Sequence, residues 1–69
     1  MGKNNEPVEV EDIEVLREAG KALVCKRLGD IEEFLIPRSQ IDPTSNVREI
    51  GDIGTLTIPE WLALDRDLL

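Results

Sequence analysis

Closely spaced carboxylates are the groups in this chain that could carry out chemistry. In EPVEVEDIEV, residues 6–15, five of the ten side chains are acidic and none is basic. Alternate residues of a β-strand lie on one side at a separation of about 6.6 Å. Glu9 and Glu11 would therefore place two carboxylates at a spacing near that of successive nucleic-acid phosphates. Glu14 would join that side if a bulge near Glu11 and Asp12 restores the alternation. The pattern predicts a phosphate-like row that binds a basic protein surface.

Further acids extend this candidate surface. A predicted hairpin carries Asp30 in its turn and Glu32 and Glu33 in its returning strand, and Glu49 with Asp52 forms a smaller cluster. For any single acid, the simpler interpretation is a solvated group that keeps a small protein soluble. For the whole set, a binding role stands level with that simpler interpretation, because dense like charges cost stability through self-repulsion. The predicted partner-binding residues are Glu9, Glu11, Glu14, Asp30, Glu32 and Glu33.

Residue types that catalysis and cofactor binding commonly need are missing from the sequence. The chain has no His and only one Cys, Cys25, so the usual zinc sites and most nucleophile triads are excluded. Gly51 and Gly54 lack the Lys and Ser or Thr of a phosphate-binding loop. Glu32 and Glu33 could act as acid and base only in a cleft that shifts their pKa values, and 69 residues leave little interior for one. We expect no enzymatic activity, no cofactor and no metal.

Length and charge restrict the class of protein. The 69 residues fit one domain with a small core, and a hydrophobic content of 41% indicates that it folds. A net charge of −7 predicts repulsion from nucleic-acid phosphates and anionic lipid. One Phe and one Trp do not make a base-stacking platform. No apolar run is longer than the four residues at 22–25, which is too short to span a membrane. We expect neither direct nucleic-acid binding nor membrane insertion.

The N-terminal residues indicate where the folded domain begins. MGKNNEP, residues 1–7, is polar and closes with Pro7, which predicts a flexible tail before a single domain at residues 8–69. The tail has no apolar core of a secretory signal, and a single cysteine cannot close an internal disulfide. These features predict a cytoplasmic protein.

Hydrophobic patterning predicts a mostly β domain of the α+β class. The expected architecture is a twisted antiparallel sheet of four or five strands, or a partly closed small barrel, with one C-terminal helix. Proline, glycine and alternation place the expected strands at residues 8–15, 21–28, 31–36, 47–50 and 54–58. The second and third strands form a hairpin, and the last two form a weaker one.

The C-terminal segment, residues 59–69, is predicted to be the helix. Pro59 suits a first helical turn because its missing N–H would be unpaired there in any residue. Trp61, Leu64 and Leu68 follow helical spacing and are expected to pack on the sheet. Trp61 and Cys25 are both predicted to be core residues.

The central hairpin is apolar on both faces. Apolar residues follow one another at 22–25 and 34–36, so both faces need cover, and one helix covers only one of them. Curling of the sheet into a barrel is the favoured solution. Alternatively a second copy of the chain covers the exposed face, with Leu23, Cys25 and Leu35 in the contact.

Two segments resemble a small module of phage and prophage proteins. The segment at residues 21–41 ends in an aromatic-x-IPxSQI pattern, and the segment at residues 54–63 ends in IPEWLA. The matching positions are Phe34, Ile36, Pro37, Ser39, Gln40 and Ile41, then Ile58, Pro59, Glu60, Trp61, Leu62 and Ala63. These are strand ends, turn formers and helix-start residues, so the resemblance implies a structural role for them and no catalytic role.

In size, acidity and phage character the chain is similar in kind to anti-CRISPR proteins, small phage-borne inhibitors. Acidic members of that class are regarded as DNA mimics. The resemblance implies an inhibitor in the bacterial host cytoplasm that occupies a basic DNA-recognition surface of a CRISPR effector complex, with type I favoured. The alternative is a homodimeric phage accessory module that acts through an apolar sheet face.

Overall fold

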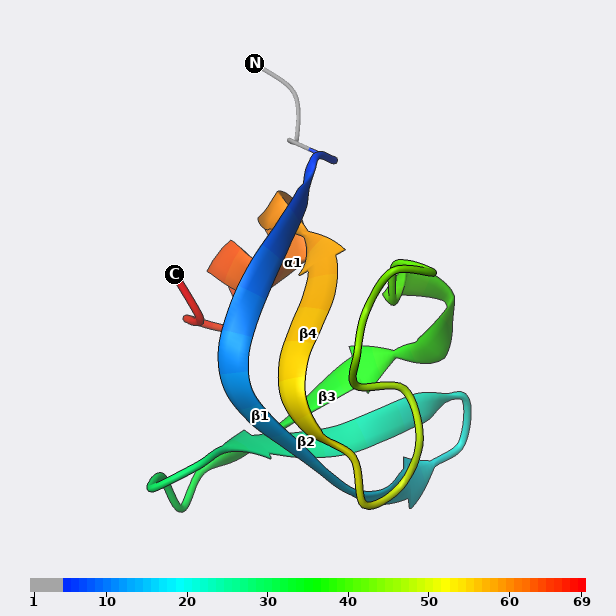
Figure 1. Ribbon diagram of the computed structural model, residues 1–69, viewed down its shortest axis with the longest axis vertical. Coiled ribbons are helices and arrows are strands. Elements are labelled where there is room, and N and C mark those ends of the chain that lie inside the picture. Colours follow the sequence, from blue (N-terminus) through cyan, green and yellow to red (C-terminus); the bar gives the residue numbers. More distant parts are fainter. Residues whose placement is uncertain (1–4) are drawn as a thin grey trace.

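Four strands and one short helix make up the fold of the computed structural model, which describes residues 5–69 (Figure 1). The strands are β1 (Pro7–Ala19), β2 (Ala22–Arg27), β3 (Glu33–Pro37) and β4 (Ile53–Pro59). A 3-10 turn, η1 (Arg38–Gln40), follows β3, and the helix α1 (Glu60–Asp65) follows β4. The sheet order is β3-β2-β1-β4, and every pairing is antiparallel. The predicted α+β class, with a four-stranded sheet and one C-terminal helix, is confirmed.

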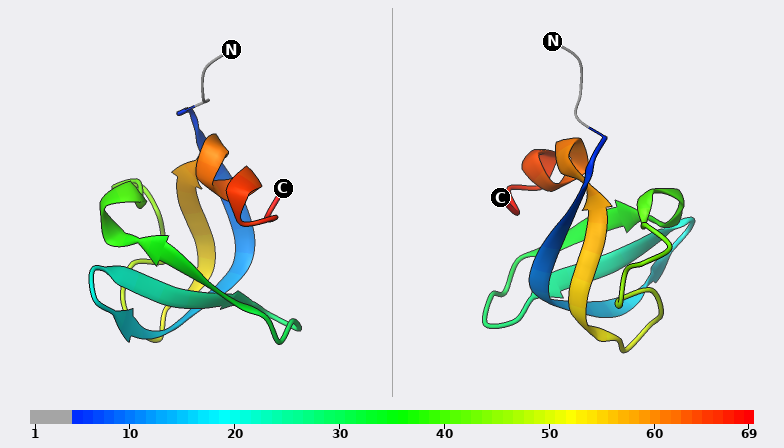
Figure 2. Two further views of the ribbon diagram at one scale, coloured as in Figure 1. Left: turned by 180° about the vertical axis from the view of Figure 1, so that it is seen from behind. Right: turned by 45° about the horizontal axis from the view of Figure 1, so that its top comes forward.

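The long strand β1 bends where its alternation changes phase. Its register with β4 shifts between Val10 and Ile13, and Asp12 has a φ of 64°. Left-handed backbone at an inserted residue is typical of a bulge, so the bulge expected near Glu11 and Asp12 is confirmed. Figures 1 and 2 show β1 curving until its two halves run in clearly different directions.

The start of β1 differs slightly from the prediction. The strand begins at Pro7, which pairs with Pro59, and the Glu6 carbonyl accepts a hydrogen bond of 2.9 Å from the Glu60 N–H. Residues 1–4 of the predicted tail lie outside the residues that the structure describes. Residues 6 and 7 therefore belong to the folded domain.

The curled sheet does not close into the favoured barrel, because β3 and β4 do not pair. A loop at residues 42–47 covers the outer edge of β4 instead. The Asp42 N–H donates to the Thr57 carbonyl at 2.9 Å, and the Asn46 N–H donates to the Thr55 carbonyl at 3.1 Å. The Ser45 hydroxyl accepts the Thr57 N–H at 3.1 Å. The loop satisfies the backbone groups of this edge, so no fifth strand is needed.

The predicted hairpin of residues 47–50 and 54–58 is wrong. Residues 47–50 form no strand, and β4 pairs with β1. The Asp52 carboxylate explains the difference, because it accepts the backbone N–H groups of Arg48 and Glu49 at 3.0 and 2.9 Å. These two backbone N–H groups, which a hairpin would use to pair its strands, are thereby held in a turn. The loop also buries Thr57.

The hydrogen bonds that the Asp52 carboxylate accepts make part of the stability of the fold depend on pH. Hydrogen bonds from the N–H groups of Arg48 and Glu49 lower the pKa of Asp52 from its ordinary value of 3.8. A carboxylate whose pKa is lowered by folding stabilises the fold at pH values above its ordinary pKa. This contribution is lost as the pH falls through the folded-state pKa. Asp52→Asn should therefore lose less stability than the parent in urea unfolding as the pH falls from about 5 through the lowered pKa of Asp52. Identical pH profiles for the two proteins would contradict this role.

The hydrophobic core lies between one face of the sheet and the C-terminal segment. Its fully buried members from the strands include Ile13, Leu23, Ile36, Leu56 and Ile58. Cys25 is also fully buried, and burial raises the pKa of its thiol to about 11. Trp61 is partly buried and packs against the same cluster. Both residues therefore have the packing role that the sequence predicts.

The helix α1 is shorter than expected and packs a different face. Leu62 and Ala63 are buried, whereas Leu64 is 54% exposed, so the predicted packed position of Leu64 is wrong. The helix ends early in a Schellman motif, with the Leu68 N–H donating to the Ala63 carbonyl at 2.8 Å. Asp67 has the left-handed φ of 59° that this motif requires. The motif redirects the chain and buries Leu68 in the core.

The hairpin of β2 and β3 has one buried and one partly open face. Leu23 pairs with Ile36, so these two residues share the core face with Cys25. Leu35 pairs with Val24 on the opposite face and is 47% exposed. The predicted dimer contact through Leu23, Cys25 and Leu35 is therefore wrong as a set, because Leu23 and Cys25 are buried on the core face and Leu35 lies on the other face.

Candidate partner-binding surface

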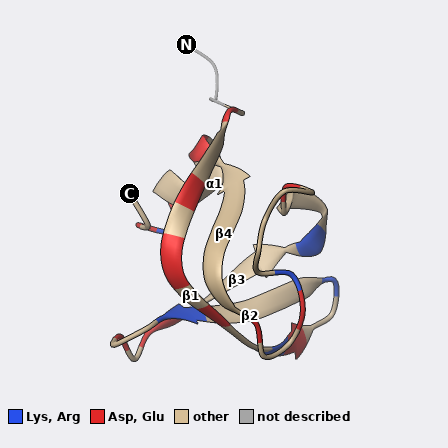
Figure 3. Ribbon diagram, viewed as in Figure 1, with Lys and Arg blue, Asp and Glu red and all other residues tan. Residues whose placement is uncertain are grey.

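The six acids predicted to bind a partner divide into two groups. One group lies along β1, and the other lies in the turn between β2 and β3 and at the start of β3 (Figure 3). The β1 acids are Glu9, Glu11 and Glu14, and the turn acids are Asp30, Glu32 and Glu33. The two groups differ in the hydrogen bonds and ion pairs that their carboxylates form within the fold.

The β1 acids point away from the core. Val10 and Ile13 are buried, so their neighbours Glu9 and Glu14 lie on the opposite face of the strand. Without the inserted residue, positions 10 and 13 would face opposite ways, and Glu14 would share the core face with Val10. Glu11 lies within the bulge and is exposed. The bulge therefore keeps Glu9 and Glu14 on the same outer face.

Within residues 5–69, no side-chain hydrogen bond or ion pair engages Glu9, Glu11 or Glu14. Lys26 stands opposite Glu14 in the register of β1 and β2, but its Nζ donates to the Asp30 carbonyl at 3.2 Å. Three carboxylates on one strand are thus open to cations of a partner.

The turn acids form more contacts within the fold than the β1 acids do. Asp30 Oδ1 accepts the N–H of Ile31 at 2.8 Å and that of Glu32 at 3.4 Å. Glu33 forms an ion pair of 2.9 Å with Arg17 on β1. The Glu32 side chain is exposed and engages no other described residue. Of this group, Glu32 is the most available to a partner.

The two acidic groups adjoin at the β1 bulge. The Leu28 N–H, at the start of the turn, donates to the Asp12 carbonyl at 2.8 Å. Asp12 is itself exposed and was not among the predicted site residues. Its place at the bulge was visible in the sequence, but its contact with the turn depends on the pairing of β1 with β2. We call the exposed residues Glu9, Glu11, Asp12 and Glu32, together with the half-buried Glu14, the acidic surface.

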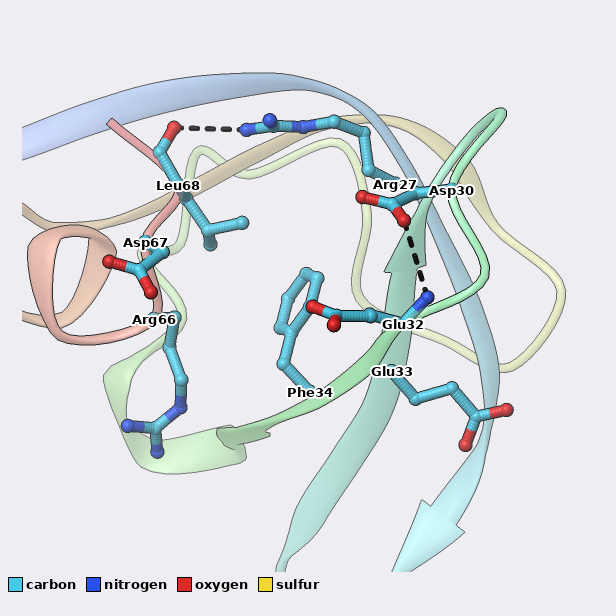
Figure 4. Close-up of a pocket in the computed structure, with 8 residues that line it drawn as sticks. All are labelled: Arg27, Asp30, Glu32, Glu33, Phe34, Arg66, Asp67 and Leu68. Carbon is cyan, nitrogen blue, oxygen red and sulfur yellow. Dashed lines mark hydrogen bonds between the residues drawn. The ribbon is translucent and has the colours of Figure 1, made fainter.

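A groove separates the turn from the C-terminal segment (Figure 4). Its volume is about 170 Å³, and Figure 4 shows the Phe34 ring between Glu32 on one side and Asp67 and Leu68 on the other. The lining residues are Arg27, Asp30, Glu32, Glu33, Phe34, Arg66, Asp67 and Leu68. Backbone carbonyls engage both guanidinium groups: Arg27 donates to Leu68 at 2.9 Å and Arg66 donates to Leu35 at 2.8 Å. The groove brings the three predicted turn acids together with Asp67.

Residues 5–69 contain no group of three or more His, Cys, Asp or Glu side chains placed to hold a metal ion. In the part of the chain that the structure describes, no helix has the length and apolar character needed to cross a membrane. The exposed acids line one strand and one turn, an arrangement suited to contacting an extended surface.

Comparison with known proteins gives no assignment. No family model matches the chain, and no match was found among curated proteins or solved structures. The arrangement of the acids is therefore the basis for the functional proposal.

Proposed function

We propose that this chain is an anti-CRISPR-type inhibitor that acts as a DNA mimic. It binds a basic DNA-recognition surface of a CRISPR effector complex, type I complexes foremost, and blocks target-DNA binding in the bacterial host cytoplasm. The observation that carries the proposal is that Glu9 and Glu14 share the outer face of β1 and Glu11 lies exposed in the bulge between them, with none of the three carboxylates engaged within the described chain.

Competition for phosphate-binding cations is the mechanism. Lys and Arg side chains that hold successive DNA phosphates would instead pair with the carboxylates of β1, where alternate strand positions such as Glu9 and Glu11 lie about 6.6 Å apart. The net charge of −7 steers the chain toward a basic surface and speeds association. Both effects weaken as added salt screens the charges.

The position of β1 favours this use. Glu9 pairs with Thr57 of β4, and Glu14 pairs with both Lys26 of β2 and Ile53 of β4, so the sheet holds the backbone at both positions. Carboxylates on such a strand lose less conformational freedom on binding than carboxylates on a loop. The acidic surface is therefore largely preorganised.

A second candidate function is a homodimeric phage accessory module. It is favoured by Leu35 and Ile53, which are 47% and 58% exposed on the sheet face opposite the core. In that case Leu35→Asp should convert a dimer into a monomer in analytical ultracentrifugation. A monomeric parent protein would exclude this candidate.

Target-DNA binding tests the inhibitor proposal. Purified CRISPR effector complexes, type I first, are titrated with labelled target DNA with and without the chain across a salt series. We expect the chain to reduce DNA binding at low salt, with partial recovery as salt rises. DNA binding that is unchanged for every complex would reject the proposal.

A further inference from the structure

The turn between β2 and β3 exposes two large apolar side chains. Leu28 is 42% exposed and Ile31 is 93% exposed, the largest exposure of any large apolar side chain among residues 5–69. Figures 1 and 2 show this turn projecting from one end of the molecule. Because the fold leaves Ile31 almost wholly in solvent, this side chain contributes almost nothing to the stability of the domain.

Hydrogen bonds hold the turn in one shape. The Asp30 N–H donates to the Arg27 carbonyl at 2.9 Å, and Asp30 Oδ1 accepts the Ile31 N–H at 2.8 Å. Lys26 Nζ also donates to the Asp30 carbonyl at 3.2 Å. A turn fixed in this way presents Ile31 at a low entropic cost, as an anchor in an interface requires.

Carboxylates surround the exposed apolar side chains. Asp30 and Glu32 flank Ile31 in the chain, and the Leu28 N–H bond to Asp12 places the β1 bulge beside the turn. An apolar centre inside a polar rim is the usual anatomy of a binding hot spot. The negative rim defines the partner as a surface with an apolar pocket bordered by Lys or Arg.

We propose that the β2–β3 turn anchors the chain to its partner by inserting Ile31 into an apolar pocket rimmed by basic side chains. The acidic surface then lies against the cations beyond that pocket. This inference rests on the proposed function, because one effector complex contacts both the turn and β1. The acids supply association rate and orientation, and Ile31 slows dissociation.

Matched alanine variants test the inference in the full chain. Affinity for a purified type I effector complex is measured for the parent, Ile31→Ala and Leu64→Ala, since Leu64 on α1 is also exposed. We expect Ile31→Ala to raise Kd about 30-fold, mainly through faster dissociation. Leu64→Ala should leave Kd within about twofold of the parent, and the thermal midpoints of all three proteins should agree within a few degrees.

Three results would overturn the inference. If Ile31→Ala binds like the parent while Glu9→Lys/Glu11→Lys loses affinity, Ile31 is no anchor and the proposed function stands. If the parent binds no effector complex, the inference and the proposed function fail together. Ile31→Leu, which keeps an apolar side chain of equal size, should retain most of the affinity, and a loss equal to that of Ile31→Ala would also contradict the inference.

Discussion

Reversing the charge of Glu9, Glu11 and Glu14 to lysine should abolish competition with target DNA while the domain remains folded. Each carboxylate is expected to contribute about 1 kcal/mol or more through a partner cation, so losing all three should weaken binding by at least about 100-fold. Competition titrations against labelled target DNA measure the effect. Retained inhibition by a folded variant would reject the β1 row as the binding element.

A matched control separates position from overall charge. The triple reversal changes the net charge from −7 to −1, because each substitution adds two units. Reversing Glu49, Glu60 and Asp65 gives the same net charge and leaves the β1 row intact. If this control loses as much affinity as the β1 variant, the row has no special role.

The fold of the β1 variant needs its own check. Lysine at position 14 would stand opposite Lys26 in β2, and facing like charges destabilise a sheet. The double variant Glu9→Lys/Glu11→Lys avoids this repulsion and should still lose most of the affinity. Thermal unfolding of both variants shows whether any lost inhibition reflects an unfolded chain.

Leu62→Ala should destabilise the domain by about 3 kcal/mol, because it deletes a buried side chain and leaves a cavity. Leu62 is 1% exposed in the core beneath α1. A domain of this size has a total stability of roughly 5 kcal/mol, so a large part of it would be lost. Urea unfolding at neutral pH measures the change.

Leu64→Ala is the matched control on the same helix. Leu64 is two residues away and 54% exposed, so its truncation should change stability by no more than about 0.5 kcal/mol. The pair distinguishes the observed helix orientation from the predicted one, which buried Leu64. Equal losses for Leu62→Ala and Leu64→Ala would contradict the orientation in the structure.

Local signals in the sequence predicted the parts of the fold that local chemistry determines. The phase change at Glu11 and Asp12 marked the bulge, and Gly29 with Pro37 marked a turn and a strand end. These features depend on residues close in the chain. Their physical causes, namely strand alternation, positive φ and a missing N–H donor, are visible without tertiary structure.

Longer-range choices were not predictable in the same way. Ile53–Pro59 pairs with β1 and not with residues 47–50, because the Asp52 carboxylate engages the donors of Arg48 and Glu49. The helix was expected to continue to Leu69, but Asp67 takes a left-handed conformation that the periodicity does not reveal. Each error arose where a single polar group overrode a regular pattern.

The candidate site was likewise predicted in part. Strand parity correctly placed Glu9 and Glu14 on one face, since a bulge was included in the prediction. The pairing of Glu33 with Arg17 joins β3 to β1 and could not be seen before the sheet order was known. Ile31 was assigned to a strand, and its exposure emerged only because the turn continues to Glu32.

Displacement of the bound chain by DNA tests the central claim most directly. Labelled chain is bound to a purified type I effector complex at low salt, and unlabelled target DNA is added while fluorescence anisotropy is recorded. If the chain and DNA compete for one basic surface, DNA should release the chain completely. The DNA concentration needed for release should rise in proportion to the concentration of chain. A stable complex that holds the chain and target DNA together would contradict the account.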